Sequence, residues 1–105
     1  MPNPPVIAVV DDDAAMREAL SELLQVFALP CRTFERAEAF LAAYAPEAFN
    51  CVITDIRMPG ISGLELLQKL NSLGSTIPVI VVTITRTEAH TFDFRFSLPI
   101  HPNEI

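Results

Sequence analysis

Carboxylates follow two separate apolar runs of this chain, and this placement is the pattern most able to support chemistry. Asp11 and Asp12 come directly after the run 6–10, and Asp55 comes directly after the run 51–54. If the two runs are neighbouring strands, the carboxylates meet at one edge of a sheet. Carboxylates that close raise one another's pKa unless a cation joins them. The pattern therefore predicts a site for a divalent metal ion and for phosphate chemistry.

The elements that position these carboxylates are strands that alternate with helices. Continuous apolar runs are typical of strands buried on both faces, and the alternation predicts a parallel sheet with right-handed crossovers. Asp13 suits the position before a helix, because its carboxylate can accept from the first free N–H groups. The predicted strands are 6–10, 31–34, 51–54 and 78–82, and the predicted helices follow Asp13, span about 36–44 and begin at Leu64. The apolar stripe of the first helix is Met16, Ala19, Leu20, Leu23, Leu24 and Phe27.

Ligands of open α/β sheets bind at the carboxyl ends of the strands. The same edge of the predicted sheet carries Asp11, Asp12, Asp55 and Thr83. The loop 58–63 contains one proline and two glycines, which suit a tight path over a site. We therefore expect this edge to be the functional one.

Length and composition are those of one globular domain. The chain has 105 residues, of which 50% are hydrophobic and 19% charged. Its net charge of −6 argues against direct binding of nucleic acid, which needs a basic surface. The N-terminus lacks the pattern of a signal peptide, and no run approaches the ~18 apolar residues of a membrane span. Cys31 and Cys51 have no partners at metal-ligand spacing, so we expect small buried thiols in a cytoplasmic protein.

The regular pattern stops after Thr83. Residues 84–91 number eight, whereas a parallel crossover with its helix takes roughly 10–12 or more. Phenylalanines at 92, 94 and 96 then alternate with polar residues, which is typical of a half-exposed strand. We predict a domain core at 1–83 and an atypical tail at 84–105. The tail either pairs antiparallel at an edge of the sheet or is not well ordered.

These residues resemble the receiver domain of two-component response regulators, in particular the subclass with a LuxR-type output. The resemblance is carried by Val-Val-Asp-Asp at 9–12, Thr-Asp-Ile-Arg-Met-Pro-Gly-Ile-Ser-Gly-Leu-Glu-Leu-Leu at 54–67, and Pro-Val-Ile-Val-Val-Thr at 78–83. It implies a flavodoxin-like (CheY-like) α/β fold, a doubly wound parallel sheet in a three-layer sandwich. The C-terminal part would be incomplete or irregular, as a receiver truncated or degenerate after residue 83.

The resemblance implies roles for five residues. Asp55 would be the phospho-acceptor, and Asp11 and Asp12 would hold Mg²⁺ with it. Arg57 would add its backbone carbonyl as a metal ligand, and Thr83 would be the switch hydroxyl. A carboxylate can attack a phosphoryl group directly, in a transfer that depends on positioning and charge neutralisation. The donor would be a sensor histidine kinase and the target a separate downstream protein, with a homodimer left open.

The chain departs from the family at one important position. The family carries a lysine followed by proline at the end of its fifth strand, and Leu98 stands there in this chain. The only lysine, Lys69, lies in the third predicted helix. Arg86 or Arg95 could replace the missing cation, with a different reach and geometry. The alternatives to a phospho-accepting receiver are therefore a non-switching interaction module or the product of a frame shift near Thr83.

The same acidic residues could also belong to an enzyme, which is the third hypothesis for this chain. Asp11 and Asp13 form an Asp-x-Asp like that of haloacid dehalogenase-type phosphatases, and Thr83 matches their later hydroxyl residue. However, Ala14 follows where that family has Thr or Gly, and the segment around Asp55 would be unexplained. We expect the chain not to be an enzyme.

Overall fold

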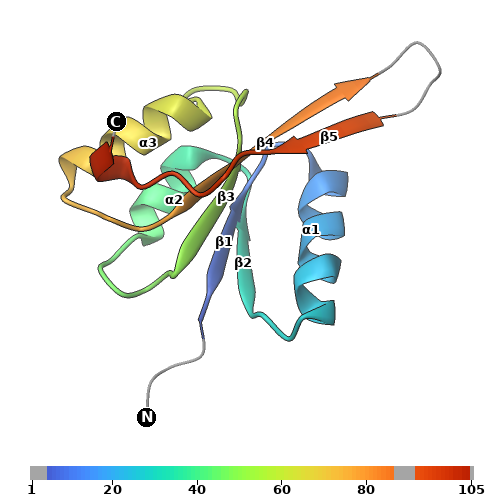
Figure 1. The fold of residues 1–105 in the computed structure, drawn as a ribbon, viewed down its shortest axis with the longest axis horizontal. Coiled ribbons are helices and arrows are strands. Elements are labelled where there is room, and N and C mark those ends of the chain that lie inside the picture. Colours follow the sequence, from blue (N-terminus) through green and yellow to red (C-terminus); the bar gives the residue numbers. More distant parts are fainter. Residues whose placement is uncertain (1–4, 87–91, 105) are drawn as a thin grey trace.

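The computed structural model describes residues 5–86 and 92–104 (Figure 1). One sheet of five strands has the order β2-β1-β3-β4-β5. The first four strands pair in parallel, and β5 pairs antiparallel with β4. This order is that of flavodoxin-like sheets, with the last strand reversed. The elements are β1 Ile7–Val10, α1 Ala14–Val26, β2 Cys31–Phe34, α2 Ala37–Ala43, β3 Cys51–Asp55, α3 Gly63–Ser72, β4 Val79–Arg86, β5 Phe92–Phe96 and the short 3₁₀ helix η1 Pro102–Glu104.

The sheet is the middle of three layers, as predicted. Figure 1 shows α1 on one side of the strands and α2 and α3 on the other. All four residues of β1 are buried because the strand is covered on both faces. Ile7 and Val9 pack toward α1, whereas Ala8 and Val10 belong to the core under α2 and α3. Strand β1 is therefore the centre about which the two cores form.

Helix α1 buries a narrower stripe than its sequence predicts. Met16, Leu20 and Leu24 are buried at four-residue spacing. The apolar periodicity also placed Ala19, Leu23 and Phe27 on this stripe. All three are exposed, Leu23 to 50% and Phe27 to 67%, so that prediction was wrong for them. In the described part of the chain, α1 is the one helix that covers this face of the sheet. It therefore contacts the sheet through a single row of side chains. Among the described residues, no neighbouring helix packs against the flanks of this apolar stripe.

The tail forms an antiparallel strand, one of the two alternatives left open by its sequence. Strand β4 pairs with β3 over Val79–Val82 and with β5 over Val82–Arg86. The second half of β4 therefore leaves the sheet and forms a two-stranded arm with β5, which projects beyond the other elements in Figure 1. Val82 belongs to both ladders, since it pairs with Asp55 on one side and with Phe96 on the other.

A bulge returns the chain from the arm to the sheet. The β4–β5 register opposes Val82 to Phe96, but Val79 then pairs with Ile100, one residue later than a regular ladder would place it. The N–H of Ser97 donates to the Val81 carbonyl, and the Val81 N–H donates to Ser97 Oγ, each at 2.9 Å. The extra residue therefore lies between Ser97 and Ile100, which re-aims the chain toward α3. Leu98, within this bulge, is 86% exposed.

In the described ranges the longest helix, α1, has 13 residues. None of the helices there is long and apolar enough to cross a membrane.

Candidate metal and phosphoryl site

Three carboxylates meet at the carboxyl edge of the sheet. Asp11, Asp12 and Asp55 each offer an oxygen atom, and these oxygens lie within 4.8 Å of one another. They converge because β1 and β3 pair in parallel, with Val10 opposite Thr54, so that both strands end at the same level. The structure thus brings together the acids of the two separate segments.

Asp11 is the most constrained member of the cluster. Its side chain is buried, and its Oδ1 accepts from the N–H of Asp13 at 2.9 Å. Arg17 Nη1 donates to the backbone carbonyl of Asp11 at 2.7 Å, which holds the chain at the start of α1. The pKa of Asp11 is raised to about 6, mainly by burial and in smaller part by the charges of Asp55 and Asp12, against the lowering by the hydrogen bond from the Asp13 N–H.

Asp55 is half-buried, and its surroundings shift its pKa in the same direction as that of Asp11. Burial raises the pKa of the Asp55 carboxyl, and the nearby charges of Asp12 and Asp13 act in the same direction. Hydrogen bonding by backbone N–H groups opposes the rise, including that of Arg57, which donates to Asp55 Oδ1 at 3.3 Å. The cluster is therefore destabilised by its own negative charge, and a bound cation would relieve it.

The donor set fits Mg²⁺. This ion prefers hard oxygen ligands and keeps several of its waters, so it is bound through a few carboxylates rather than an all-protein cage. Asp11 is buried, whereas Asp12 is exposed and Asp55 is half-buried, so one side of the cluster stays open to water and to a phosphoryl group. The Arg57 N–H places its backbone beside Asp55, but the role of the Arg57 carbonyl as a ligand stays a prediction.

Asp13 stands apart from the cluster. Its carboxylate accepts from the Ala15 N–H at 2.9 Å and caps α1, as its sequence position predicted. This cap also brings the Asp13 N–H against Asp11, so one residue starts the helix and orients the buried acid.

The loop after β3 packs tightly on the backbone of Asp55. Ser62 caps α3 through the Glu65 N–H, and Gly63 donates to the Ile56 carbonyl at 3.1 Å. A Cβ atom at Gly63 would lie 2.5 Å from the carbonyl oxygen of Asp55, so only glycine allows this approach. Thr54, which is fully buried, donates to the same oxygen at 3.0 Å. The backbone of Asp55 is thus fixed from two sides.

Glu38 is a residue of this loop system that the sequence did not reveal. It lies on α2, and its Oε1 accepts from the Ile61 N–H at 2.9 Å. Gly60 has a positive φ of 78°, and a side chain there would collide with the same carboxylate. Glu38 therefore ties the loop to a neighbouring helix, a contact across 23 residues that no local motif announces.

Thr83 follows Val82, the partner of Asp55 in the sheet, and is half-buried. It stands opposite Arg95 in the β4–β5 register. Both residues line a hollow of about 370 Å³ between α3 and the arm, together with Phe96 and Ser97. The structure thus places Thr83 beside the acid edge, with a cation as its cross-strand neighbour.

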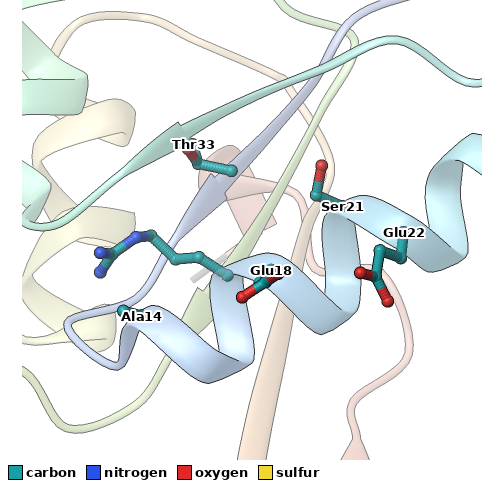
Figure 2. Close-up of a pocket in the computed structure, with 6 residues that line it drawn as sticks. Ala14, Glu18, Ser21, Glu22 and Thr33 are labelled. Atoms are coloured by element: carbon teal, nitrogen blue, oxygen red, sulfur yellow. The ribbon is translucent and has the colours of Figure 1, made fainter.

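A second hollow, of about 280 Å³, lies between α1 and β2. Figure 2 shows that Glu18, Ser21 and Glu22 reach it from α1 and Thr33 from β2. Arg17 also lines it, although its guanidinium is already bound to the Asp11 carbonyl. Its lining shares no residue with the acid cluster, so we assign the chemistry to Asp11, Asp12 and Asp55.

Comparison with known proteins agrees with this geometry. The response regulator receiver domain family matches residues 7–95. The transcriptional regulatory protein FixJ of Azorhizobium caulinodans is 48% identical over 83 residues, which cover 79% of this chain and 39% of that protein. The response regulator protein TodT of Pseudomonas putida strain F1 is 35% identical over 108 residues, covering 95% of this chain and 47% of that protein. The crystal structure of full-length FixJ from B. japonicum superposes with a TM-score of 0.70 at 42% identity, over 75% of this chain and 39% of that one.

These matches also bear on the extent of the domain. The chain spans less than half the length of each of these relatives. The family match continues past Thr83 to residue 95, so the comparisons do not confirm a truncation at residue 83, and the division at that residue stays a prediction. The sheet order, the three layers and the matched segment lead to one conclusion: the chain belongs to the response regulator receiver domain family.

Proposed function

We propose that Asp55 accepts a phosphoryl group from a sensor histidine kinase at a Mg²⁺ site formed with Asp11 and Asp12. The observation that carries this proposal is the convergence of the three carboxylates within 4.8 Å at the ends of two adjacent parallel strands. Receiver domains act in two-component phosphorelays with histidine kinases and output proteins, which also supports the cytoplasmic location expected from the sequence.

The transfer uses few protein groups. A carboxylate oxygen of Asp55 attacks the phosphorus of a phosphohistidine, the P–N bond breaks, and the imidazole leaves with its electron pair and takes up a proton. The Arg57 N–H holds Oδ1 of Asp55, while Gly63 and Thr54 pack against its backbone, so the carboxylate is oriented before the donor arrives. Asp11, Asp12 and Asp55 would hold Mg²⁺, and the ion would neutralise part of the negative charge of the reacting groups.

Thr83 is proposed as the hydroxyl that responds to the phosphoryl group. Its place one residue beyond the sheet partner of Asp55 supports this role. Arg95 is the proposed substitute for the family lysine, because it faces Thr83 across the arm, whereas Leu98 is exposed in the bulge. The signal would then pass to a downstream protein through the surface around the arm.

The missing lysine also supports a second candidate, a receiver-like module that binds partners without switching. The exposed Leu98 in place of a cation is the observation that favours it. The two candidates differ in one measurable property, the formation of an acyl phosphate on Asp55.

Incubation with acetyl phosphate and Mg²⁺, followed by intact-mass analysis, tests the proposal. We expect a mass gain of one phosphoryl group that hydroxylamine removes, as an acyl phosphate requires. Asp55→Asn should gain nothing, and Asp13→Asn should be labelled like the wild type, because Asn preserves the helix cap. A wild-type chain that is folded but unlabelled would favour the non-switching module.

We further propose that the chain is not a phosphatase of the haloacid dehalogenase type. The helix-capping role of Asp13 supports this, since the second aspartate of that motif would be occupied by the Ala15 N–H. Steady turnover of p-nitrophenyl phosphate that survives Asp55→Asn would contradict it.

A further inference from the structure

We propose that Arg17 is a positioning residue for the Mg²⁺ site, because its guanidinium fixes the peptide unit that joins Asp11 to Asp12. This role deepens the proposed function and rests on its metal site. Arg17 lies on α1, outside the acid cluster. A cation beside acids would ordinarily compete with Mg²⁺ rather than assist its binding. The contacts of Arg17 indicate a different role.

The Arg17 side chain reaches back six residues and ends on the backbone of Asp11. Nη1 donates to the Asp11 carbonyl at 2.7 Å, and Nη2 lies 3.8 Å from Glu35 Oε1. The Arg17 side chain is only 16% exposed, whereas that of Glu35 is 78% exposed, so water screens the ion pair at its acidic end. The bond to the carbonyl is therefore the stronger of the two contacts, as expected of a short charge-assisted hydrogen bond.

This contact completes the hydrogen bonding of Asp11. The Asp11 N–H donates to the Phe34 carbonyl of β2 at 3.0 Å, and Asp11 Oδ1 accepts from the Asp13 N–H at 2.9 Å. With Arg17 on the carbonyl, the N–H, the side chain and the C=O of Asp11 each have a partner. The buried acid is thus held at three points, and Arg17 supplies the one that neither strand pairing nor the helix cap provides.

The position of Asp12 depends on the same contact. Its side chain is exposed, yet it offers an oxygen within 4.8 Å of those of Asp11 and Asp55. The peptide unit between Asp11 and Asp12 is planar, so a donor fixed to the Asp11 carbonyl also fixes the direction in which the chain continues to Asp12. Without Arg17, this unit would be free to rotate, and Mg²⁺ would have to order both carboxylates as it binds. Arg17 therefore favours metal binding by preorganising two of the ligands.

Arg17→Met tests this role, because methionine keeps part of the apolar stem and removes the donors. A general effect of charge and a positioning effect have opposite signs here. Loss of a nearby positive charge alone should strengthen Mg²⁺ binding. We expect the Kd for Mg²⁺, measured by calorimetric titration, to rise about tenfold instead. Arg17→Lys, which keeps a donor of shorter reach, should restore the Kd to within about threefold of wild type.

Two control variants separate the carbonyl contact from other effects. Glu35→Gln removes the ion pair but leaves the Asp11 contact, and should change the Kd by less than about twofold. Arg32→Met makes the same change of charge on β2, where the exposed guanidinium lies 5.3 Å from the ring centroid of Phe34, and should not weaken Mg²⁺ binding. Circular dichroism checks that each variant is folded.

The rate at which acetyl phosphate labels Asp55 is a second readout. Arg17→Met should be slower than the wild type at limiting Mg²⁺ and approach its rate at saturating Mg²⁺, whereas a rate that stays low at every concentration would contradict a positioning role. A wild-type chain that binds Mg²⁺ but is never labelled would contradict the proposed function, and the calorimetric comparison would still decide the role of Arg17. A folded Arg17→Met chain that binds Mg²⁺ as tightly as the wild type, or an equal loss of affinity in Glu35→Gln, would overturn the inference.

Discussion

Gly63 lies directly against the backbone of Asp55. A methyl group on Gly63 would come within 2.5 Å of the Asp55 carbonyl oxygen and 3.1 Å of the Ile56 Cα atom. Both neighbours are backbone atoms, which cannot turn aside as a flexible side chain can. The first turn of α3 is thereby fixed to the residue that we propose as phospho-acceptor.

Gly63→Ala should push α3 away from the end of β3. We expect a loss of about 2 kcal/mol in the free energy of unfolding, typical of overpacking in a tight contact, and weaker Mg²⁺ binding. Gly74→Ala is the matched control, since Gly74 also lies beside α3 but has open space around its Cα atom. It should lose about 1 kcal/mol, because its positive φ disfavours alanine, and keep its Mg²⁺ affinity. Urea unfolding and calorimetric titration distinguish the two effects.

The acid cluster predicts a pH dependence of stability in the absence of metal. The pKa of Asp11 is about 6 in the folded chain and 3.8 in the unfolded one, so the folded state binds the proton more tightly between these values. Stability should therefore fall as the pH rises from about 4 to 7, by about 2 kcal/mol, since the exposed Asp12 lets water screen part of the effect. The raised pKa of Asp55 acts in the same direction.

Asp11→Asn should flatten this dependence and raise the stability measured with EDTA at pH 7. Added Mg²⁺ should stabilise the wild type at pH 7 and have little effect at pH 4, where the carboxylates bind protons instead. Thermal unfolding followed by circular dichroism measures both. Stability of the metal-free wild type that rises over this pH range would contradict the charge repulsion described for the site.

Ser97→Ala should remove the partner of a buried N–H group. The Val81 N–H donates to Ser97 Oγ, and Val81 is only 8% exposed, so water cannot replace the hydroxyl. The expected loss is about 2 kcal/mol in unfolding free energy, and Ser97→Thr should retain most of it. Ser72→Ala, which removes an exposed hydroxyl bonded to the Lys69 carbonyl, is the control and should lose less than about 0.5 kcal/mol. Equal losses at Ser97 and Ser72 would argue against the bulge geometry.

Glu38→Ala should release the loop that follows Asp55. The Ile61 N–H would lose its carboxylate partner, and we expect a Mg²⁺ affinity about threefold weaker, with a stability loss of about 1 kcal/mol. Glu38→Gln keeps an accepting oxygen and should behave like the wild type. Glu22→Ala, on the exposed side of α1, controls for the change in net charge. Identical Mg²⁺ titrations of the Glu38→Ala and wild-type chains would show that the contact has no role at the site.

The sequence predicted the fold and the site correctly where the pattern depends on residues close together in the chain. Continuous apolar runs located β1 and β3, and parallel pairing then required Asp11 and Asp55 to meet. The direction of β5 was harder to predict, because alternation with a period of two is the same in parallel and antiparallel strands. Only the short connection between β4 and β5 indicated that β5 runs antiparallel. Periodicity also could not show that Leu23 and Phe27 lack a neighbour, since exposure depends on the elements around a helix. The contact of Glu38 with Ile61 arises only once the chain is folded.

Strand β4 is divided by its neighbours into two parts of unequal stability. Up to Val82, strand β4 lies between β3 and the returning chain. From Thr83 onward, β5 is the one strand of the described residues that pairs with it. Opening of the arm therefore disrupts one ladder, while opening of the first half requires disruption of the hydrophobic core as well. We therefore expect amide hydrogen exchange to change from slow to fast near Thr83. Its hydroxyl can accordingly shift with the arm while the parallel ladder that holds Asp55 stays closed.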